Sequence, residues 1–312
     1  MTKIMLTGAN GFVGSALKAE LASDSGVHLV SAVRSGGASP DCVAVGNIDG
    51  CTDFSEALIG VDVVIHAAAR AHIMRDEVDD PLGEYRKVNV EGTLNLARQA
   101  IAAGVRRLVF LSSIKVNGEA TTAGNRFQAD DMPAPEDAYG LSKLEAEQGL
   151  MSLASGTAME VVIIRPPLVY GAGVKGNFAS MIKLVDKGVP LPLGAINNKR
   201  SLIGIDNLVD LIVRCIGHPA AANQVFLAGD GKDLSTTELL RGVSKALGKP
   251  SRLVPVPARL LHFGATLLGK KLLSQRLLGS LQVDISKTCE RLDWTPPYSV
   301  EEGLKRCFDR FN

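Results

Sequence analysis

A glycine-rich turn near the N-terminus places the tightest limit on how this chain can fold. Lys3–Thr7 has the character of a short apolar strand, and Gly14–Ala22 has the pattern of a helix. Gly8, Gly11 and Gly14 lie where the strand gives way to the helix. Glycine permits a tight turn and lets backbone amides approach a diphosphate, which the N-terminal end of a helix attracts. The spacing GxxGxxG differs from the more common GxGxxG, but its position predicts a dinucleotide-binding βαβ unit.

Strand-like and helix-like segments alternate through the first half of the chain. Further strands are expected at Val27–Val33, Val61–His66, Arg107–Leu111 and Glu160–Arg165, and further helices at Asp53–Ile59, Gly83–Ala103 and Asp137–Leu153. The strands are continuously apolar, as in a parallel sheet whose two faces are both covered by helices. We therefore expect an α/β fold with a doubly wound, parallel Rossmann sheet.

The character of the sequence changes after Arg165. Two prolines end the last strand, glycines and further prolines interrupt the following segment, and helical patterns dominate from about Gly231. In open α/β sheets, ligands bind at the carboxyl ends of the strands, so a second part is expected to close over that edge. We predict a dinucleotide-binding domain of residues 1–170 and about 204–230, and a smaller, mostly helical C-terminal substrate-binding part of about 171–203 and 231–312.

The overall charge argues against some kinds of partner. The 312 residues include 34 basic and 33 acidic side chains, for a net charge of +1. This balance gives no reason to expect nucleic acid or an anionic membrane as the main partner. The chain contains no run of about 18 uncharged apolar residues, so no membrane-spanning helix is expected.

The cysteines point to a reducing environment. Cys42, Cys51, Cys215, Cys289 and Cys307 are odd in number, scattered, and without CxxC spacing. We therefore expect buried or half-buried thiols, no disulfide framework and no metal site. The sequence starts at once with a strand and leaves no room for a cleavable signal segment, so we expect a cytoplasmic protein.

One late segment is unusually rich in leucine. Arg259–Leu281 is apolar but is interrupted by Lys270, Lys271 and Arg276. This pattern predicts an amphipathic helix that packs within the C-terminal part. A helix that lies on a membrane surface is the alternative.

The end of the second strand bears on the choice of cofactor. An NAD-binding site usually offers a carboxylate there to hold the ribose hydroxyls, but this chain reads Ala32-Val33-Arg34-Ser35. Arg34 could pair with a 2′-phosphate, which slightly favours NADP over NAD. Alternatively, Arg34 stacks on the adenine or points to solvent.

Tyr139 and Lys143 carry the strongest chemical signal. They are four residues apart and therefore share one face of the helix that Asp137 is placed to cap. A tyrosine is a poor base at neutral pH, but a nearby ammonium and an oxidised nicotinamide both favour the phenolate and lower its pKa. Ser112 and Ser113 follow the strand Arg107–Leu111. A serine at that edge can hydrogen-bond a reacting substrate oxygen.

With these motifs in this order, the chain resembles an extended short-chain dehydrogenase/reductase of the nucleotide-sugar epimerase/dehydratase/reductase family. The matching segments run nearly from end to end: Thr7–Gly14, Val64–Ala69, Asn89–Thr93, Phe110–Gly118, Tyr139–Lys143, Arg165–Gly171 and Leu292–Pro296. Together they are specific for the family, but they do not specify the sugar.

The resemblance implies a role for particular residues. Ser113, Tyr139 and Lys143 would be catalytic, with Tyr139 as general acid/base and Lys143 on the nicotinamide ribose. The cofactor-binding residues would be Gly8, Asn10, Gly11, Phe12, Val13, Gly14, Arg34, Asn47, Ile48, Ala67, Ala68, Ala69, Asn89, Tyr139, Lys143, Pro166 and Val169. The substrate-binding residues would be Ser113, Asn177, Arg200 and Arg276, with the last three on the diphosphate of the substrate.

Departures from the family pattern narrow the reaction. Dehydratases of the family place an acidic pair after the catalytic hydroxyl, whereas Ile114 and Lys115 stand here, which disfavours dehydration. The resemblance implies C4 redox chemistry on a UDP-linked hexose, with a UDP-sugar 4-epimerase as the first choice and a homodimer as a possible assembly. The alternatives are an NAD(P)H-dependent reductase of a UDP-4-keto-6-deoxy-hexosamine for surface polysaccharides and, less favoured, a non-catalytic NADP-sensing module.

Overall fold

The computed structural model describes residues 1–36, 41–71, 80–122, 124–174, 176–267, 269 and 277–309, with the backbone alone at Asn177 and Asp309. Within these residues, seven parallel strands form the main sheet, in the order β3-β2-β1-β4-β5-β6-β9. Their bounds are β1 Thr2–Thr7, β2 Val27–Val33, β3 Cys42–Ala44, β4 Val63–His66, β5 Arg107–Leu111, β6 Glu160–Arg165 and β9 Gln224–Leu227. All five strands expected from the sequence are present, and the α/β fold with its parallel Rossmann sheet is confirmed.

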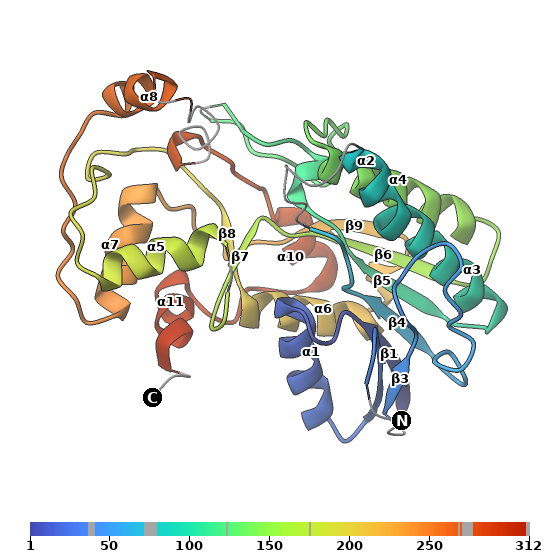
Figure 1. Cartoon of the computed structure of the whole chain (residues 1–312). Coiled ribbons are helices and arrows are strands. Elements are labelled where there is room, and N and C mark those ends of the chain that lie inside the picture. The colour runs from blue at the N-terminus through green and yellow to red at the C-terminus, as the bar shows by residue number, and fades with distance from the viewer. Residues whose placement is uncertain are drawn as a thin grey trace.

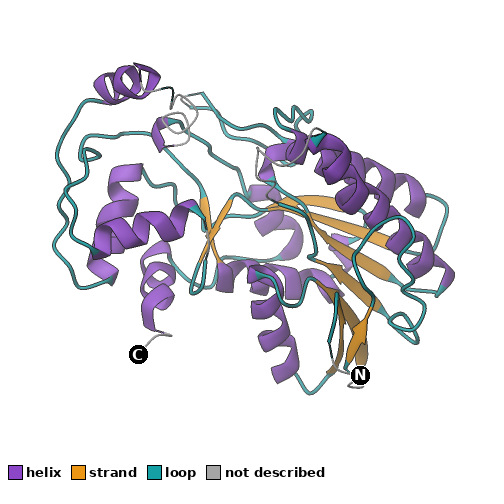
Figure 2. Ribbon diagram, viewed as in Figure 1, coloured by secondary structure: helices purple, strands orange, loops and turns teal. Residues whose placement is uncertain are grey.

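Helices cover both faces of the main sheet (Figures 1 and 2). On one face lie α1 (Phe12–Ser23) and α6 (Ile205–Gly217), and on the other lie α3 (Thr93–Ala102) and α4 (Ala138–Ala154). In β1, Ile4 and Leu6 pack into the first layer and Met5 packs into the second, with all three side chains fully buried. Because both faces of each central strand are covered, the strands are apolar throughout instead of alternating.

Two predicted helices differ from the structure. The segment Asp53–Ile59 forms a series of turns, because the Asp53 side chain accepts a hydrogen bond from the Ser55 amide and Gly60 ends the segment in a left-handed conformation. The predicted helix Gly83–Ala103 is divided into three consecutive segments. These are α2 (Pro81–Arg86), the π-helix η1 (Lys87–Gly92) and α3.

The helical C-terminal part lies on one side of the main sheet, at the left of Figure 1. It contains a parallel pair of strands, β7 (Leu168–Tyr170) and β8 (Leu202–Gly204), with α5 (Asn177–Asp186), α7 (Thr236–Ala246), α8 (Ala258–Leu267) and α11 (Val300–Asp309). The helix α10 (Ser286–Leu292) and the 3₁₀ turns η2 (Ile114–Val116) and η3 (Pro219–Ala221) complete the described elements. A separate apolar core fills this part and includes Tyr170, Phe178, Leu240 and Leu304.

A buried carboxylate joins this part to the main sheet. Asp230 follows β9 and accepts hydrogen bonds from the Tyr170 hydroxyl (2.7 Å), the Gly204 amide (2.9 Å) and the Asn207 side chain (2.7 Å). These donors belong to β7, β8 and α6. Burial raises the pKa of Asp230 although its hydrogen bonds act in the opposite direction.

The leucine-rich segment Arg259–Leu281 is not the single packed helix that its pattern predicts. The helix α8 ends at Leu267, and none of its residues is buried. Its largest apolar side chains, Leu260, Phe263 and Leu267, are 62%, 64% and 73% exposed. The prediction of a packed helix is therefore wrong for the part of this segment that the structure describes.

Arg107 fixes the end of α6 against the sheet. Its side chain is 2% exposed, and Nε donates a hydrogen bond to Glu160 at 2.8 Å. Nη1 donates to the carbonyl oxygens of Cys215, Ile216 and His218 at 2.7, 3.1 and 3.0 Å. The last carbonyls of a helix have no partner within the helix, so Arg107 satisfies groups that would otherwise be buried without one.

We expect Arg107→Met to lower the free energy of unfolding by about 3 kcal/mol, because it leaves Glu160 and the α6 carbonyls without their partner. The exposed neighbour Arg106 provides the control, and Arg106→Met should change stability by less than about 0.5 kcal/mol. Urea unfolding measures both. Equal stabilities of the two variants would show that Arg107 does not hold α6.

Candidate active site

The predicted site residues follow neighbouring strands of the main sheet. Arg34, Gly8, Ala67, Ser112 and Pro166 come directly after β2, β1, β4, β5 and β6, which are neighbours in this order. All these strands are parallel, so their carboxyl ends meet at one edge of the sheet. The structure thus brings together segments that lie far apart in the sequence, at the edge where ligands bind in such folds.

The glycine-rich turn has room for backbone only. Gly8 has a φ of +73°, and a Cβ added there would lie 2.7 Å from the Ala68 nitrogen. A Cβ added to Gly14 would lie 2.0 Å from the Gly8 carbonyl oxygen. α1 begins at Phe12 behind Gly11, without a side-chain cap and without an acidic residue in its first turn. These features fit a diphosphate, which backbone amides at a helix N-terminus can bind closely.

A buried histidine holds the neighbouring segment at the end of β4. His66 is 1% exposed; Nδ1 is hydrogen-bonded to Thr7 Oγ1 at 2.6 Å, and Nε2 to Thr93 Oγ1 at 2.9 Å. Thr7 Oγ1 also accepts a hydrogen bond from the Ala68 amide at 3.2 Å. Burial, with a smaller effect of the Lys143 charge, lowers the pKa of His66 to about 3. The imidazole is therefore neutral and fixes the Ala67–Ala69 segment beside Gly8.

The N-terminus of α4 is held by two charges of opposite sign. Asp137 caps the helix, as predicted, because its carboxylate accepts a hydrogen bond from the Gly140 amide at 2.7 Å. The ammonium of Lys115 binds both Asp137 and Glu119. Burial lowers the pKa of Lys115, but the hydrogen bonds to Asp137 and Glu119 outweigh it and leave the pKa raised. A Cβ on Gly140 would lie 2.7 Å from the Lys115 carbonyl oxygen, so α4 packs directly on η2.

Tyr139 lies in the first turn of α4 and is half-buried. Its ring meets that of Tyr85 edge to face, with centroids 5.8 Å apart. Burial raises the pKa of Tyr139, and the charges of Asp137 and Tyr85 add to this effect. With its pKa raised, the phenol is protonated at neutral pH. A positive charge nearby must lower this pKa before the phenolate can act as a base.

Lys143 reaches from α4 to the end of β5. Its Nζ donates a hydrogen bond to the Leu111 carbonyl at 2.8 Å and lies 4.3 Å from the centroid of the Phe110 ring. Its residue is 1% exposed. Burial lowers the pKa of Lys143 to about 7, although the negative charge of Glu147 partly opposes this shift. The side chain can therefore change its charge near neutral pH.

The two serines after β5 have different surroundings. Ser112 is buried and donates a hydrogen bond to Glu147 at 2.5 Å, so its hydroxyl proton is used within the protein. Ser113 is half-buried, and its Oγ accepts a hydrogen bond from the Lys115 amide at 3.3 Å. Accepting this bond leaves the hydroxyl proton available for another partner. The geometry thus favours Ser113 over Ser112 as the serine that could meet a ligand.

A buried ion pair beneath these residues was not identified from the sequence. Glu147 and Arg165 have side chains 4% and 5% exposed, and they share hydrogen bonds at 2.5, 3.0 and 3.2 Å. Arg165 also donates to Asn117 at 3.0 Å. One signal pointed to Glu147, because Tyr139, Lys143 and Glu147 recur every four residues and so continue one face of α4.

The side-chain amide of Asn89 forms its hydrogen bonds within the protein. Its Oδ1 accepts a hydrogen bond from the Arg70 amide at 2.9 Å, and its Nδ2 donates to the Arg70 carbonyl at 3.1 Å and to Ser142 Oγ at 3.0 Å. Asn89 thereby joins the segment after β4 to α4. A direct contact between Asn89 and the cofactor stays a prediction.

Other predicted cofactor residues lie around the same edge. Arg34 and Asn47 are exposed, Ile48 packs against Gly92, and Pro166 accepts a hydrogen bond from the Ile114 amide at 3.0 Å. Val169 lies in β7, close behind Pro166. Contacts between these residues and a cofactor stay predictions.

The predicted substrate residues lie in the C-terminal part. Arg200 donates a hydrogen bond to the Gly279 carbonyl at 3.1 Å, and burial lowers the pKa of its guanidinium. Asn177 is the first residue of α5, where the backbone alone is described, and Arg276 lies outside the described residues. The structure therefore places Arg200 beside Gly279, three residues after Arg276 in the sequence, and the joint role of the three residues stays a prediction.

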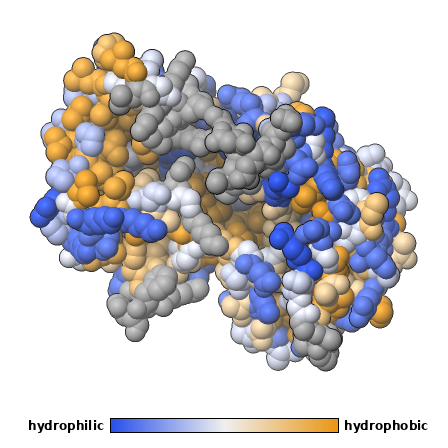
Figure 3. All heavy atoms as spheres, viewed as in Figure 1, coloured by the Kyte–Doolittle hydropathy of each residue, from blue (hydrophilic) through white to orange (hydrophobic). Residues whose placement is uncertain are grey.

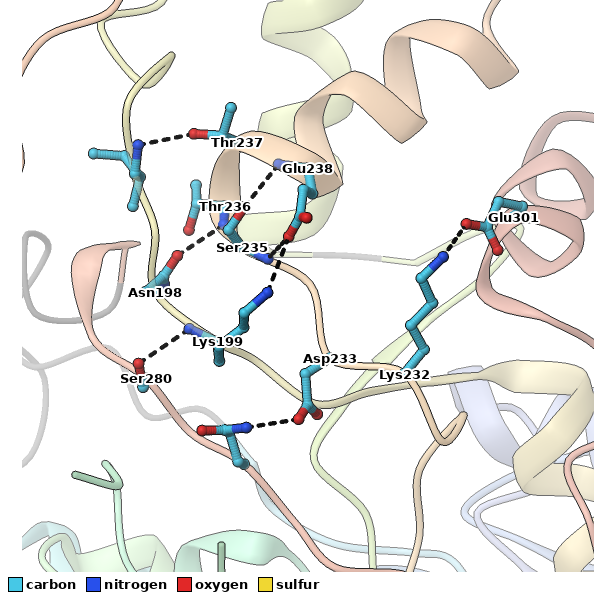
Figure 4. A network of polar contacts seen from close by, with 12 residues as sticks. Asn198, Lys199, Lys232, Asp233, Ser235, Thr236, Thr237, Glu238, Ser280 and Glu301 are labelled. Atoms are coloured by element: carbon cyan, nitrogen blue, oxygen red, sulfur yellow. Dashed lines mark hydrogen bonds and ion pairs between the residues drawn. The ribbon is translucent and has the colours of Figure 1, made fainter. Parts of the chain in front are cut away.

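A network of polar contacts fixes the segment that carries Arg200 (Figure 4). Asn198 accepts a hydrogen bond from the Thr236 amide at 2.8 Å, and the Lys199 amide donates to Ser280 at 3.0 Å. The N-terminus of α7 is closed by a capping box between Ser235 and Glu238. That helix end is therefore already satisfied by its own side chains. The backbone of Arg200 is held against Leu234 by two hydrogen bonds of 2.9 and 3.0 Å.

The fold and the turn at its sheet edge define a Rossmann-type protein with a cradle for a dinucleotide. Residues 4–229 match the model of the NAD dependent epimerase/dehydratase family, and the chain belongs to this family. It is therefore an enzyme, which sets aside the non-catalytic alternative. No helix in the described part of the chain is long and apolar enough to cross a membrane.

Similar proteins cover nearly the whole chain. A UDP-glucose 4-epimerase of Vibrio cholerae is 53% identical over 311 residues, which are 99% of this chain and 95% of that protein. An N-acetyl-alpha-D-glucosaminyl-diphospho-ditrans,octacis-undecaprenol 4-epimerase of Escherichia coli O157:H7 is 28% identical, with 97% and 93% covered. The crystal structure of a Bacillus cereus UDP-glucuronic acid 4-epimerase in complex with NAD has a similar fold, with a TM-score of 0.78, 22% identity and coverage of 99% and 98%.

The depressed pKa of Lys143 has a consequence for stability. Between about pH 7 and pH 10.5, the unfolded chain binds a proton at this lysine that the folded protein does not, so the contribution of Lys143 to the free energy of unfolding rises with pH. Lys143→Met removes this dependence. The free energy of unfolding of Lys143→Met minus that of the unaltered protein should therefore be larger at pH 7 than at pH 10, by up to about 4 kcal/mol.

Urea unfolding at the two pH values measures this difference. Lys18→Met, on the exposed side of α1, is the control. Its free energy of unfolding minus that of the unaltered protein should be the same at both pH values. If Lys143→Met also gave the same difference at both pH values, Lys143 would not be titrating near neutrality.

Proposed function

We propose that this enzyme is a UDP-sugar 4-epimerase, which inverts C4 of a UDP-linked hexose through transient oxidation. One observation carries the proposal: Lys143 is hydrogen-bonded to the end of β5, which brings the helix of Tyr139 to the sheet edge that also carries Ser113 and the glycine-rich turn. The Vibrio cholerae UDP-glucose 4-epimerase, 53% identical over nearly the whole chain, supports this choice of reaction.

We propose NAD as the bound cofactor. The cradle of Gly8, Gly11 and Gly14 would take the diphosphate, because any side chain at Gly8 or Gly14 would strike the backbone. The segment Ala67–Ala69, which His66 fixes, would line the nicotinamide side together with Pro166. When bound, the nicotinamide supplies the site that accepts hydride from C4 of the sugar and later returns it.

Tyr139 would hold and move the proton at O4 of the sugar. Burial and Asp137 keep its pKa high, so the phenol is protonated until a positive charge approaches. The ammonium form of Lys143, one helical turn away, provides such a charge and lowers the pKa of the phenol. Lys115 reduces the opposing effect of Asp137 by pairing with it.

Ser113 would donate a hydrogen bond to O4 and so hold the sugar in position while the proton moves. Its position is fixed on both sides, since its Oγ accepts from the Lys115 amide and the adjacent Ser112 is bonded to Glu147. Epimerisation also requires the 4-ketone to turn over between the two hydride transfers. A substrate held mainly by its diphosphate can do this without leaving.

We further propose that Asn177, Arg200 and Arg276 hold that diphosphate. An arginine fork suits phosphate oxygens, and Arg200 is kept in place by the network of Figure 4. In this proposal, residues 1–170 and about 204–230 bind the cofactor, whereas about 171–203 and 231–312 bind the UDP-sugar. The separate apolar core of the C-terminal part supports this division.

Three finer predictions belong to the same proposal. The exposed Arg34 at the end of β2 lets the site accept NADP as well as NAD. The five cysteines are free thiols, which supports a cytoplasmic location. The assembly is a homodimer, which light scattering of the purified protein tests.

The supply of hydride separates the epimerase from the reductase. An epimerase regenerates its cofactor in every turnover, so we expect UDP-glucose or UDP-N-acetylglucosamine to yield its 4-epimer without added NADH or NADPH. NMR of the sugar anomeric protons follows this conversion. A reductase would instead consume NADPH stoichiometrically with a UDP-4-keto-6-deoxy-hexosamine and form no epimer from either UDP-sugar, an outcome that would replace the proposed function.

Tyr139→Phe tests the proton transfer. It retains the ring and removes the hydroxyl, so we expect the turnover rate to fall at least about 10²-fold, with UDP-sugar binding nearly unchanged. Tyr85→Phe is the matched control because it removes the hydroxyl from the other ring of the same pair. It should alter the rate less than about tenfold. Similar rates for Tyr139→Phe and the unaltered enzyme would rule out Tyr139 as the acid/base.

A further inference from the structure

The helix α8 presents an apolar stripe to solvent. Leu260, Phe263 and Leu267 are spaced three and four residues apart, so they share one face of the helix. They are the side chains that are 62%, 64% and 73% exposed, while Leu261 and Ala265, on the opposite face, are half-buried. Figure 3 shows the corresponding apolar surface at the upper left, where α8 lies in Figure 1.

The sequence around α8 is strongly positive. The 35 residues from 249 to 283 contain no aspartate or glutamate, and they include six basic residues: Lys249, Arg252, Arg259, Lys270, Lys271 and Arg276. Lys249 is paired with Asp186, whereas Arg259 is exposed directly before Leu260. The net charge of +1 for the whole chain therefore hides a local excess of positive charge in this stretch of the sequence.

The size of the stripe distinguishes between possible occupants. A helix of ten residues is about 15 Å long, and three side chains on it offer far less than the roughly 800 Å² per partner of a stable protein interface. A second copy of the chain would also bring a second positive segment to the contact. An anionic lipid surface, in contrast, matches both features, because it takes up a narrow apolar face and attracts basic residues such as Arg259 beside it.

We propose that α8 docks this enzyme on an anionic membrane surface, with Leu260, Phe263 and Leu267 entering the interface and Arg259 facing the lipid headgroups. The docking is reversible, because one short helix buries few apolar groups. It is weakened by salt, because basic residues supply part of the attraction. Docking through Leu260, Phe263, Leu267 and Arg259 involves none of the residues assigned above to the cofactor or to the UDP-sugar.

Flotation with lipid vesicles tests the proposal. The purified full chain is mixed with vesicles of phosphatidylcholine alone or with about 30% phosphatidylglycerol, at about 0.1 M and about 0.5 M NaCl, which shortens the Debye length from about 10 Å to about 4 Å. We expect binding to the phosphatidylglycerol vesicles at low salt, and at least a fivefold loss of bound protein in high salt or without the anionic lipid. Absence of binding to anionic vesicles would overturn the proposal, as would equal binding to both kinds of vesicle.

Two matched variants locate the contact. Phe263→Glu places a charge in the stripe and should reduce the bound fraction at least fivefold. Ile59→Glu, 66% exposed in the main domain, should leave it unchanged. Turnover of a UDP-sugar in solution should be the same in both variants, which separates loss of docking from loss of folding. Equal vesicle binding by the two variants would overturn the role of α8, and so would a shift from dimer to monomer caused by Phe263→Glu in light scattering.

Discussion

Two opposite charges, Glu147 on α4 and Arg165 at the end of β6, meet beneath the sheet edge with almost no access to water. Burying such charges is costly unless each is paired and its remaining hydrogen-bonding capacity is used. Both conditions are met, because Ser112 donates to the carboxylate and Arg165 donates to Asn117. The pair therefore holds α4, β5, β6 and the loop after η2 in one fixed arrangement. Removing either partner would leave a buried charge unpaired beneath the site.

The charged groups around the site are paired with one another, so Tyr139 and Lys143 are the two groups that can take part in proton transfer. Glu147 with Arg165 and Asp137 with Lys115 balance their charges on either side of Tyr139 and Lys143. His66 adds a rigid neutral contact, because burial keeps it uncharged. Tyr139 and Lys143 are left as the groups whose protonation changes with their surroundings. Burial raises the pKa of the first and lowers that of the second, so the protein environment alone makes both neutral at mildly alkaline pH.

Much of this arrangement could be predicted from the sequence, because it depends on local patterns. The five strands, the glycine-rich turn and the cap of α4 by Asp137 each follow from neighbouring residues, and the structure confirms them. The pairing of Glu147 with Arg165 could not be predicted, since it joins residues on two elements whose relative position only the folded sheet defines. The turns at Asp53–Ile59 were mistaken for a helix because their apolar residues are buried in a helix-like pattern.

Short edge strands were also missed. β3 contains only three residues, and the four residues of β9 begin with the polar Gln224, so neither shows the apolar run by which the sequence marks β4. The surroundings of the predicted diphosphate residues could not be predicted for another reason. Arg200 contacts Gly279, which lies 79 residues further along the chain. Such contacts are set by the packing of the C-terminal part rather than by spacing along the sequence.

The π-helix η1 sets the rotational phase of the helix that follows it. Its wider turn holds one more residue than an α-helical turn, so every side chain of α3 is rotated by about 100° relative to an uninterrupted helix. This rotation directs Leu96, Ala97 and Ala100 onto the sheet, where they are fully buried, while Asn89 within η1 faces Ser142. A single-residue deletion here would turn the apolar side of α3 away from the sheet. The segment is thus a point where chain length is constrained more strictly than residue identity.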